Sequence, residues 1–346
     1  MSSTRDTVVS PGSRILVTGV SGFIGSHVAD QLLARGYSVT GTTRDASKIA
    51  WIQQLFDNKY GIGKFNIVEI ADFNKTAVFD TVLEGVSGIV HAASDMSMNP
   101  DPNKVITPMV DGVRNMLEAS ARQPSVKRFV LTSSCASAAS AGAPPQTVDV
   151  DTWNDGVSQA AWAPPPYQAE RGFAVYAASK MEAEREAWKW YREHKPHFVL
   201  NTVLPSMNFG KSLDPVNQGH PSTSFMVQAV FQGNVEVVEN APQYFFVDVQ
   251  DNARIHVAAL LHPEVQDQRI FAYAAPYTWR NVQRVIQKLY PGKVIDKYIA
   301  DAEPDKSEVI PAPRAEALLK EMGRLGWTSL EDCVKMNTED LAAEAA

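Results

Sequence analysis

The stretch RILVTGVSGFIG, Arg14 to Gly25, decides the fold of this chain. Its first half, RILVTG, is too short for a helix and has the aliphatic, β-branched composition of a buried parallel strand. Apolar residues at helical spacing follow from Ile24 to Leu33, and Gly36 stands where that helix should end. A second apolar run, Tyr37 to Thr43, then predicts another strand. The stretch therefore opens a strand–helix–strand unit.

Short apolar runs continue along the chain and alternate with helical or irregular segments. The further strands are expected at residues 65–70, 88–93, 128–134 and 197–205. This alternation predicts an α/β fold with a doubly wound parallel sheet of the Rossmann type. From about Ser206 the pattern gives way to Gly, Pro, Asn and aromatic residues, which predicts a smaller, interleaved C-terminal lobe.

The junction between the first strand and its helix carries the pattern T-G-x-x-G-x-x-G. Gly19 permits a tight turn, Gly22 lets backbone amides approach a pyrophosphate at the helix N-terminus, and Gly25 allows the helix to pack close to the strand. The glycines could serve packing alone, but their place between strand and helix favours a dinucleotide. The residues expected to contact it are Thr18, Gly19, Gly22, Phe23, Ile24 and Gly25.

The end of the second strand indicates which dinucleotide is bound. An NAD site usually places a carboxylate there for the ribose 2′-hydroxyl, whereas this chain has Thr42, Thr43 and Arg44. Arg44 and Lys48 could bind a 2′-phosphate, so NADPH/NADP is the expected cofactor. Alternatively, both are solvated cations partly neutralised by Asp45.

Tyr176 and Lys180 stand four residues apart in the segment FAVYAASKMEAE. On a helix this spacing puts both side chains on one face. A neighbouring ammonium favours the phenolate form of a tyrosine, so Lys180 should make Tyr176 a better proton donor. Ser133 and Ser134 end a predicted strand, at the edge of the sheet where such folds bind ligands. One of them could hold a substrate carbonyl, or both could merely cap the strand.

Together, the glycine motif, LTSS (residues 131–134) and YAASK (residues 176–180) resemble the extended short-chain dehydrogenase/reductase superfamily. Over nearly the whole chain, segments such as VKRFVLTSS and VYAASKMEAE are similar to its dihydroflavonol reductase-like group. The resemblance is strongest to microbial NADPH-dependent aldehyde and ketone reductases. It implies a catalytic serine at Ser134, a proton donor at Tyr176 and a ribose-binding lysine at Lys180.

The resemblance also implies a wider set of cofactor contacts. They are Arg44 and Lys48 at the 2′-phosphate, Ala92 near a ribose or the pyrophosphate, and Pro205 near the nicotinamide. Separately, Asp72 follows the third strand and could accept a hydrogen bond from the adenine amino group. The chain departs from the family at Met109, where many members carry an asparagine. A proton relay through that position is therefore in doubt.

Composition narrows the substrate class. The formal net charge of −7 and the dispersed Lys and Arg disfavour nucleic acid or an anionic membrane as partner. Lys211 is the single cation between Ser206 and Gln250, which is few for a nucleotide-sugar pyrophosphate. An apolar pocket for a small carbonyl substrate is expected instead, although each residue could equally be core. Its candidate residues are Met96, Met98, Met207, Phe225, Met226 and Gln243.

The sequence thus predicts an NADPH-dependent carbonyl reductase that acts on hydrophobic aldehydes or ketones. Alternatives are a reductase for one flavonoid-like or polyketide-like ketone, and a nonenzymatic NADP-binding regulator. No metal site or secretory signal is expected, and the predicted protein is a cytoplasmic monomer or homodimer. The expected organisation is a flexible N-terminus over residues 1–12, a dinucleotide-binding domain with the catalytic residues over 13–205, and a substrate lobe over 206–346 with returning sheet elements around 245–272.

Overall fold

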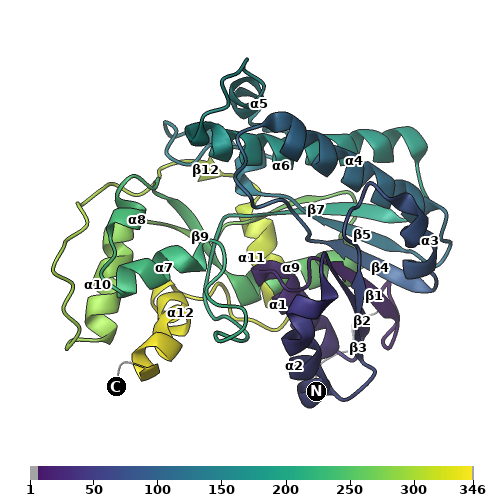
Figure 1. Ribbon diagram of the computed structural model, residues 1–346, viewed down its shortest axis with the longest axis horizontal. Helices are drawn as coiled ribbons and strands as arrows, with labels where there is room; N and C mark the ends of the chain where they lie inside the picture. Colours follow the sequence, from purple (N-terminus) through teal and green to yellow (C-terminus); the bar gives the residue numbers. More distant parts are fainter. Residues whose placement is uncertain (1–6, 345–346) are drawn as a thin grey trace. The chain divides into compact units, whose positions relative to one another are not determined.

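A seven-stranded sheet forms the centre of the fold in the computed structural model, which describes residues 7–344 (Figure 1). Its order is β10-β7-β5-β4-β1-β2-β3, and every recorded pair from β3 to β7 is parallel. The strands are β1 (Arg14–Thr18), β2 (Ser38–Thr43), β3 (Phe65–Glu69), β4 (Val86–His91), β5 (Arg128–Thr132), β7 (Val199–Pro205) and β10 (Arg269–Ala272). The expected doubly wound parallel sheet is confirmed.

Helices cover both faces of this sheet (Figure 1). They are α1 (Phe23–Leu33), α2 (Ala50–Tyr60), α3 (Phe79–Val82), α4 (Pro102–Ala121), α5 (Asp155–Ala161), α6 (Gly172–His194) and α9 (Val249–Leu261), with short 3-10 turns η1 (Ala46–Ile49), η2 (Thr76–Val78), η3 (Cys135–Ser137) and η4 (Ala169–Arg171). Figure 1 shows α4 and α6 on one face and α1 and α2 on the other. Because both faces are covered, the interior strands β1, β4, β5 and β7 are buried along most of their length.

The core under α4 and α6 contains Phe129 and Leu131 of β5 with Leu117 of α4 and Trp188 of α6. Trp188 and Trp190 are almost fully buried there, so their role is helix packing.

The strand order reverses between β1 and β4, which sends successive helices to opposite faces. Ligands of open α/β sheets bind at the carboxyl ends of strands beside such a reversal. Thr18 ends β1 and His91 ends β4, and the Oγ1 of Thr18 lies 3.0 Å from the Nδ1 of His91. This edge of the sheet is therefore where the site should be found.

The chain divides into two compact units. Unit 1 comprises residues 1–140, 152–204 and 256–270, and unit 2 comprises residues 141–151, 205–255 and 271–346. Unit 2 contains β6 (Thr147–Val148), β8 (Met207–Phe209), α7 (Ser224–Phe231), α8 (Glu236–Glu239), β9 (Tyr244–Asp248), β11 (Ala275–Tyr277), α10 (Trp279–Leu289), β12 (Glu308–Val309), α11 (Ala312–Glu321) and α12 (Leu330–Glu344). Its core is aromatic, with Phe209 packed against Tyr277 and Trp279.

Of the N-terminal segment expected to be flexible, residues 1–6 lie outside the described part of the chain. In the remainder, Val9 is fully buried, and its carbonyl accepts a hydrogen bond from the hydroxyl of Tyr37 at 3.0 Å. None of the helices within residues 7–344 is long and apolar enough to span a membrane.

Candidate functional site

The glycine turn between β1 and α1 is built on close backbone contacts. Gly19 has a φ of +64°, a conformation that favours glycine, and a Cβ on it would lie 2.8 Å from the Cα of Ala93. A Cβ on Gly25 would lie 2.3 Å from the carbonyl oxygen of Gly19. The turn therefore needs glycine at both positions, and it presents bare backbone at the edge of the sheet.

The N-terminus of α1 opens from this turn without a side-chain cap. The N-cap residue is Gly22, which has no side chain to accept a hydrogen bond from the first amide groups, and the first turn of α1 contains no acidic residue. The first amide groups of a helix have no intrahelical acceptor, and they carry the positive end of the helix dipole. This end of α1 thus fits an anionic group such as a pyrophosphate.

The two cations after β2 differ in their environment. Lys48 is exposed, and its ammonium lies 3.1 Å from the carboxylate of Asp45. Hydrogen bonds from Ser47, followed by the contact with Lys48, hold the pKa of Asp45 below its ordinary value. Arg44 is exposed and makes no hydrogen bond or ion pair with residues 7–344. Asp45 therefore neutralises Lys48 and leaves the Arg44 guanidinium available.

Asp72 and Ala92 are the other predicted contacts in unit 1. The carboxylate of Asp72 is exposed, and one of its oxygens accepts a hydrogen bond from the Asn74 amide at 2.9 Å, which stabilises a turn. The other carboxylate oxygen takes no part in that hydrogen bond. Ala92 is half-buried beside His91. The amide of Ala93 donates to the Oγ1 of Thr18 at 3.0 Å, which holds this segment against the glycine turn.

Three residues at four-residue intervals share one face of α6, namely Tyr176, Lys180 and Glu184. The ammonium of Lys180 is buried and donates to the carbonyl oxygen of Thr132 at 2.7 Å. Thr132 is the last residue of β5. Lys180 thus ties the helix to the strand end that carries the two serines.

The two serines at the end of β5 have different partners. The hydroxyl of Ser134 accepts a hydrogen bond from the amide of Ala136 at 3.2 Å, and it is near enough to Tyr176 to lower the pKa of that phenol. The hydroxyl of Ser133 instead donates to the Oε2 of Glu184 at 2.6 Å. The structure therefore brings together Ser134, Tyr176 and Lys180 at the carboxyl edge of the sheet.

The pKa of Tyr176 departs from the sequence expectation. Burial raises it to about 12, the neighbouring Cys135 adds to the rise, and the hydrogen bond with Ser134 lowers it. The expected lowering by Lys180 is not seen, because the ammonium of Lys180 is directed to the carbonyl of Thr132. Burial also lowers the pKa of Lys180 to about 8, against an opposing effect of Glu184. Near neutral pH the site therefore holds a protonated phenol beside an ammonium group.

Glu184 was not identified from the sequence, although it is the most extensively bonded residue of this region. Its side chain is fully buried and accepts hydrogen bonds from Ser133, Thr202 and Arg269. The available signal was an acidic residue on a buried helical face between Ala183 and Ala187.

The predicted pocket residues have mixed surroundings. In unit 1, Met96 and Met98 are 47% and 41% exposed on the segment after β4. In unit 2, Phe225 is 47% exposed, whereas Met207 and Met226 pack against the aromatic core. The remaining pocket candidate, Gln243, accepts a hydrogen bond from the Trp279 amide through its side-chain oxygen at 2.9 Å. Pro205, predicted to lie near the nicotinamide, is buried at the end of β7.

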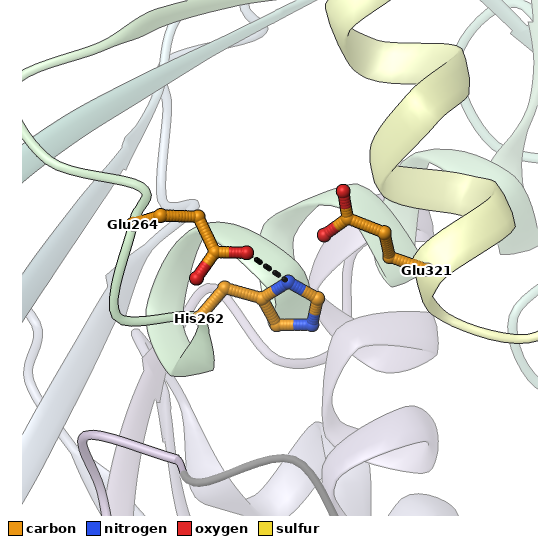
Figure 2. Close-up of side chains that lie close together, drawn as sticks. All are labelled: His262, Glu264 and Glu321. Atoms are coloured by element: carbon orange, nitrogen blue, oxygen red, sulfur yellow. Dashed lines mark ion pairs between the residues drawn. The ribbon is translucent and has the colours of Figure 1, made fainter. Parts of the chain in front are cut away.

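One histidine–glutamate pair outside the catalytic edge is drawn in Figure 2. The Nδ1 of His262 lies 3.9 Å from a carboxylate oxygen of Glu264, both in unit 1. Glu321 in the same figure belongs to unit 2. Two ligand atoms in unit 1 fall short of the three or four protein ligands of a zinc site.

Comparisons with known proteins agree with this geometry. A model described as the NAD dependent epimerase/dehydratase family matches residues 15–273. Ketoreductase adrE of Penicillium rubens is 38% identical over 96% of this chain and 97% of its own. Aldehyde reductase 2 of Sporidiobolus salmonicolor is also 38% identical, over 97% and 98% respectively.

A solved structure supports the fold. Yeast methylglyoxal/isovaleraldehyde reductase Gre2, crystallised with NADPH, superposes with a TM-score of 0.79 at 22% identity, covering 96% of this chain and 99% of its own. The resemblance to extended short-chain dehydrogenases/reductases of the aldehyde and ketone reductase type is confirmed.

Proposed function

The chain belongs to the NAD dependent epimerase/dehydratase family, and from this premise we propose that it reduces aldehydes or ketones to alcohols with NADPH. The observation that carries the proposal is the hydrogen bond from Lys180 to the carbonyl of Thr132 at 2.7 Å, which sets Lys180 and Tyr176, one helical turn apart on α6, against the strand end that Ser134 follows. This group offers two hydroxyls to a carbonyl oxygen and a cation nearby.

The residues of unit 1 fit a dinucleotide with a 2′-phosphate. The bare glycine turn and the uncapped start of α1 suit the pyrophosphate. Arg44 is free to bind a 2′-phosphate through a planar pair of donors, with Lys48 close by but already paired to Asp45. When bound, the cofactor supplies the hydride for the carbonyl carbon.

The protein's part in the reaction is to handle the proton and the developing charge. Ser134 donates a hydrogen bond to the substrate carbonyl oxygen, and Tyr176 transfers its proton to that oxygen as negative charge accumulates there. A pKa of about 12 means that Tyr176 holds its proton until the oxygen becomes strongly basic. Lys180 is the adjacent cation that stabilises the phenolate formed.

The substrate class follows from the relatives and from the side chains available. The relatives named above are a ketoreductase and an aldehyde reductase. Met96 and Met98 in unit 1 and Phe225 in unit 2 expose apolar surface, which suits hydrophobic carbonyl compounds. A reductase for one specific flavonoid-like or polyketide-like ketone is the second candidate; the similarity to a protein named a ketoreductase supports a ketone substrate.

The test is the loss of NADPH absorbance when the purified protein meets aromatic aldehydes, β-ketoesters and bulky ketones, with NADH in parallel. Tyr176→Phe is expected to lower turnover at least about 100-fold while NADPH still binds. Tyr191→Phe is the matched control, because Tyr191 lies on the same helix with its hydroxyl 2.7 Å from Asp267, and it should keep wild-type turnover. Equal turnover in the Tyr176 variant would refute the assignment, and NADPH binding without turnover on any carbonyl would favour a nonenzymatic role.

A further inference from the structure

The carboxylate of Glu184 joins α6 to three strands of the sheet. It accepts from the Ser133 hydroxyl at 2.6 Å at the end of β5 and from the Thr202 hydroxyl at 2.8 Å on β7. The Nε of Arg269, at the start of β10, lies 2.9 Å away. Both charged side chains are almost entirely shielded from solvent. The guanidinium of Arg269 also stacks over Trp153 at 3.8 Å.

These bonds meet the catalytic residues at the strand end. Lys180 holds the carbonyl of Thr132, and Glu184, one turn further along α6, holds the side chain of Ser133. Ser134 follows directly in the chain and is the residue whose hydroxyl acts on the pKa of Tyr176. The last residue of β5, Thr132, and the residue after it, Ser133, are thus fixed by two successive turns of α6.

We propose that Glu184 is a positioning residue for carbonyl reduction, which fixes the segment after β5 against α6 and so sets the place of Ser134 relative to Tyr176. The negative charge of Glu184 also favours the ammonium form of Lys180. The inference rests on the proposed function. It extends that function to a residue that touches neither substrate nor cofactor.

A purely structural role would not require these charges. A buried ion pair is costly to desolvate, and well-packed apolar side chains of similar volume often stabilise a fold as well or better. What an apolar pair cannot supply is a negative charge near Lys180. Two titratable groups interact electrostatically with Lys180, Glu184 on α6 and His91 on β4. Burial lowers the pKa of His91 to about 3, so this imidazole is neutral and the negative charge near Lys180 is that of Glu184, which is also paired with Arg269.

The first experiment compares Glu184→Gln with Glu186→Gln. Glu186 lies on the same helix and bonds to Arg114 at 2.8 Å on α4, away from the serines. In Glu184→Gln we expect kcat to fall about 10- to 100-fold, because small misplacements of reacting groups have effects of this size. The Kd for NADPH should stay within about threefold. Glu186→Gln should keep wild-type kcat.

The pH dependence separates positioning from stability. Loss of the Glu184 charge should lower the midpoint of Lys180 ionisation by about one pH unit, since a nearby opposite charge favours the charged form. This midpoint is measured directly by NMR titration after reductive ¹³C-methylation of lysines, with Lys180→Arg to assign the signal. The readout does not require turnover, so an inactive wild-type protein would refute the proposed function while the titration still tests Glu184.

An unchanged Lys180 midpoint together with wild-type kcat in Glu184→Gln would overturn the inference. If Glu184→Gln does not fold, the same measurements are made on the double variant Glu184→Met/Arg269→Met, which removes both buried charges. A folded double variant with lowered kcat and a lowered Lys180 midpoint supports the positioning role. Wild-type kcat in that variant overturns it.

Discussion

Gly25→Ala tests whether the close contact between α1 and the preceding turn is required for cofactor binding. The added Cβ would lie 2.3 Å from the Gly19 carbonyl oxygen, 3.0 Å from its carbonyl carbon and 3.2 Å from the Cα of Val20. All of these atoms are backbone, so no side chain can rotate away. The helix must move outward by about 1 Å, which should destabilise the fold by about 1–3 kcal/mol.

The same movement should displace the first amide groups of α1 from the phosphate position. We expect the affinity for NADPH to fall at least about tenfold, measured by isothermal titration calorimetry, alongside a lower Tm. The control is Gly156→Ala in the first turns of α5, where an added Cβ has no atom within 4 Å. That change should leave NADPH binding intact and raise stability by up to about 1 kcal/mol. Wild-type affinity in Gly25→Ala would refute the reasoning.

Three further predictions concern charge. Arg44→Ala should weaken NADPH binding about 10- to 100-fold and leave NADH binding nearly unchanged. Lys48→Ala should weaken NADPH binding less, because Lys48 is paired to Asp45. Equal losses of affinity for both cofactors in Arg44→Ala would contradict the assignment of Arg44 to the 2′-phosphate. The kcat/KM for carbonyl reduction should fall above about pH 8, because Lys180 loses its proton there while Tyr176 keeps its own. If kcat/KM stayed constant up to pH 10, Lys180 would not be the required cation. Burial raises the pKa of Asp248 to about 7, so the folded protein binds more protons than the unfolded chain between about pH 4 and 7. Stability should therefore fall as pH rises through that window, by an amount on the order of 4 kcal/mol. Asp248→Asn should flatten this dependence in thermal unfolding.

The parts of the fold that the sequence predicts well are those set by local patterns. Each of the six expected strands is present, because a buried parallel strand must be a short, continuous apolar run. The glycine turn is equally readable, since the positive φ of Gly19 and the close approach at Gly25 exclude side chains. The four-residue spacing of Tyr176 and Lys180 is enough to predict that both lie on one face of a helix.

Other features depend on contacts between distant segments. Arg269 meets Glu184 across 85 residues, and nothing near either residue indicates the pairing. The strands β6 and β12 contain two residues each, too few to show a period, although they pair within unit 2. The C-terminal helices α11 and α12 are separated by the irregular segment 322–329, whose ends are set by packing within unit 2 and not by a local pattern.

Chemical properties set by burial are also hidden from the sequence. The spacing of Tyr176 and Lys180 suggests a lowered phenol pKa, but burial dominates and Lys180 turns to a backbone carbonyl. The sequence alone does not tell which of the two serines after β5 faces Tyr176. In the structure Ser133 donates its hydrogen bond to Glu184, and Ser134 is the serine that acts on the pKa of Tyr176.

The uncapped start of α1 also affects how stable the folded protein is without a bound ligand. A serine or aspartate at Gly22 would satisfy one of the free amide groups and stabilise the isolated chain, by about 1 kcal/mol in ordinary helices. The same side chain would occupy the place proposed for the pyrophosphate. A ligand that completes this helix end stabilises the folded state in proportion to the logarithm of its concentration. The amount of intact protein would then follow the supply of its own cofactor.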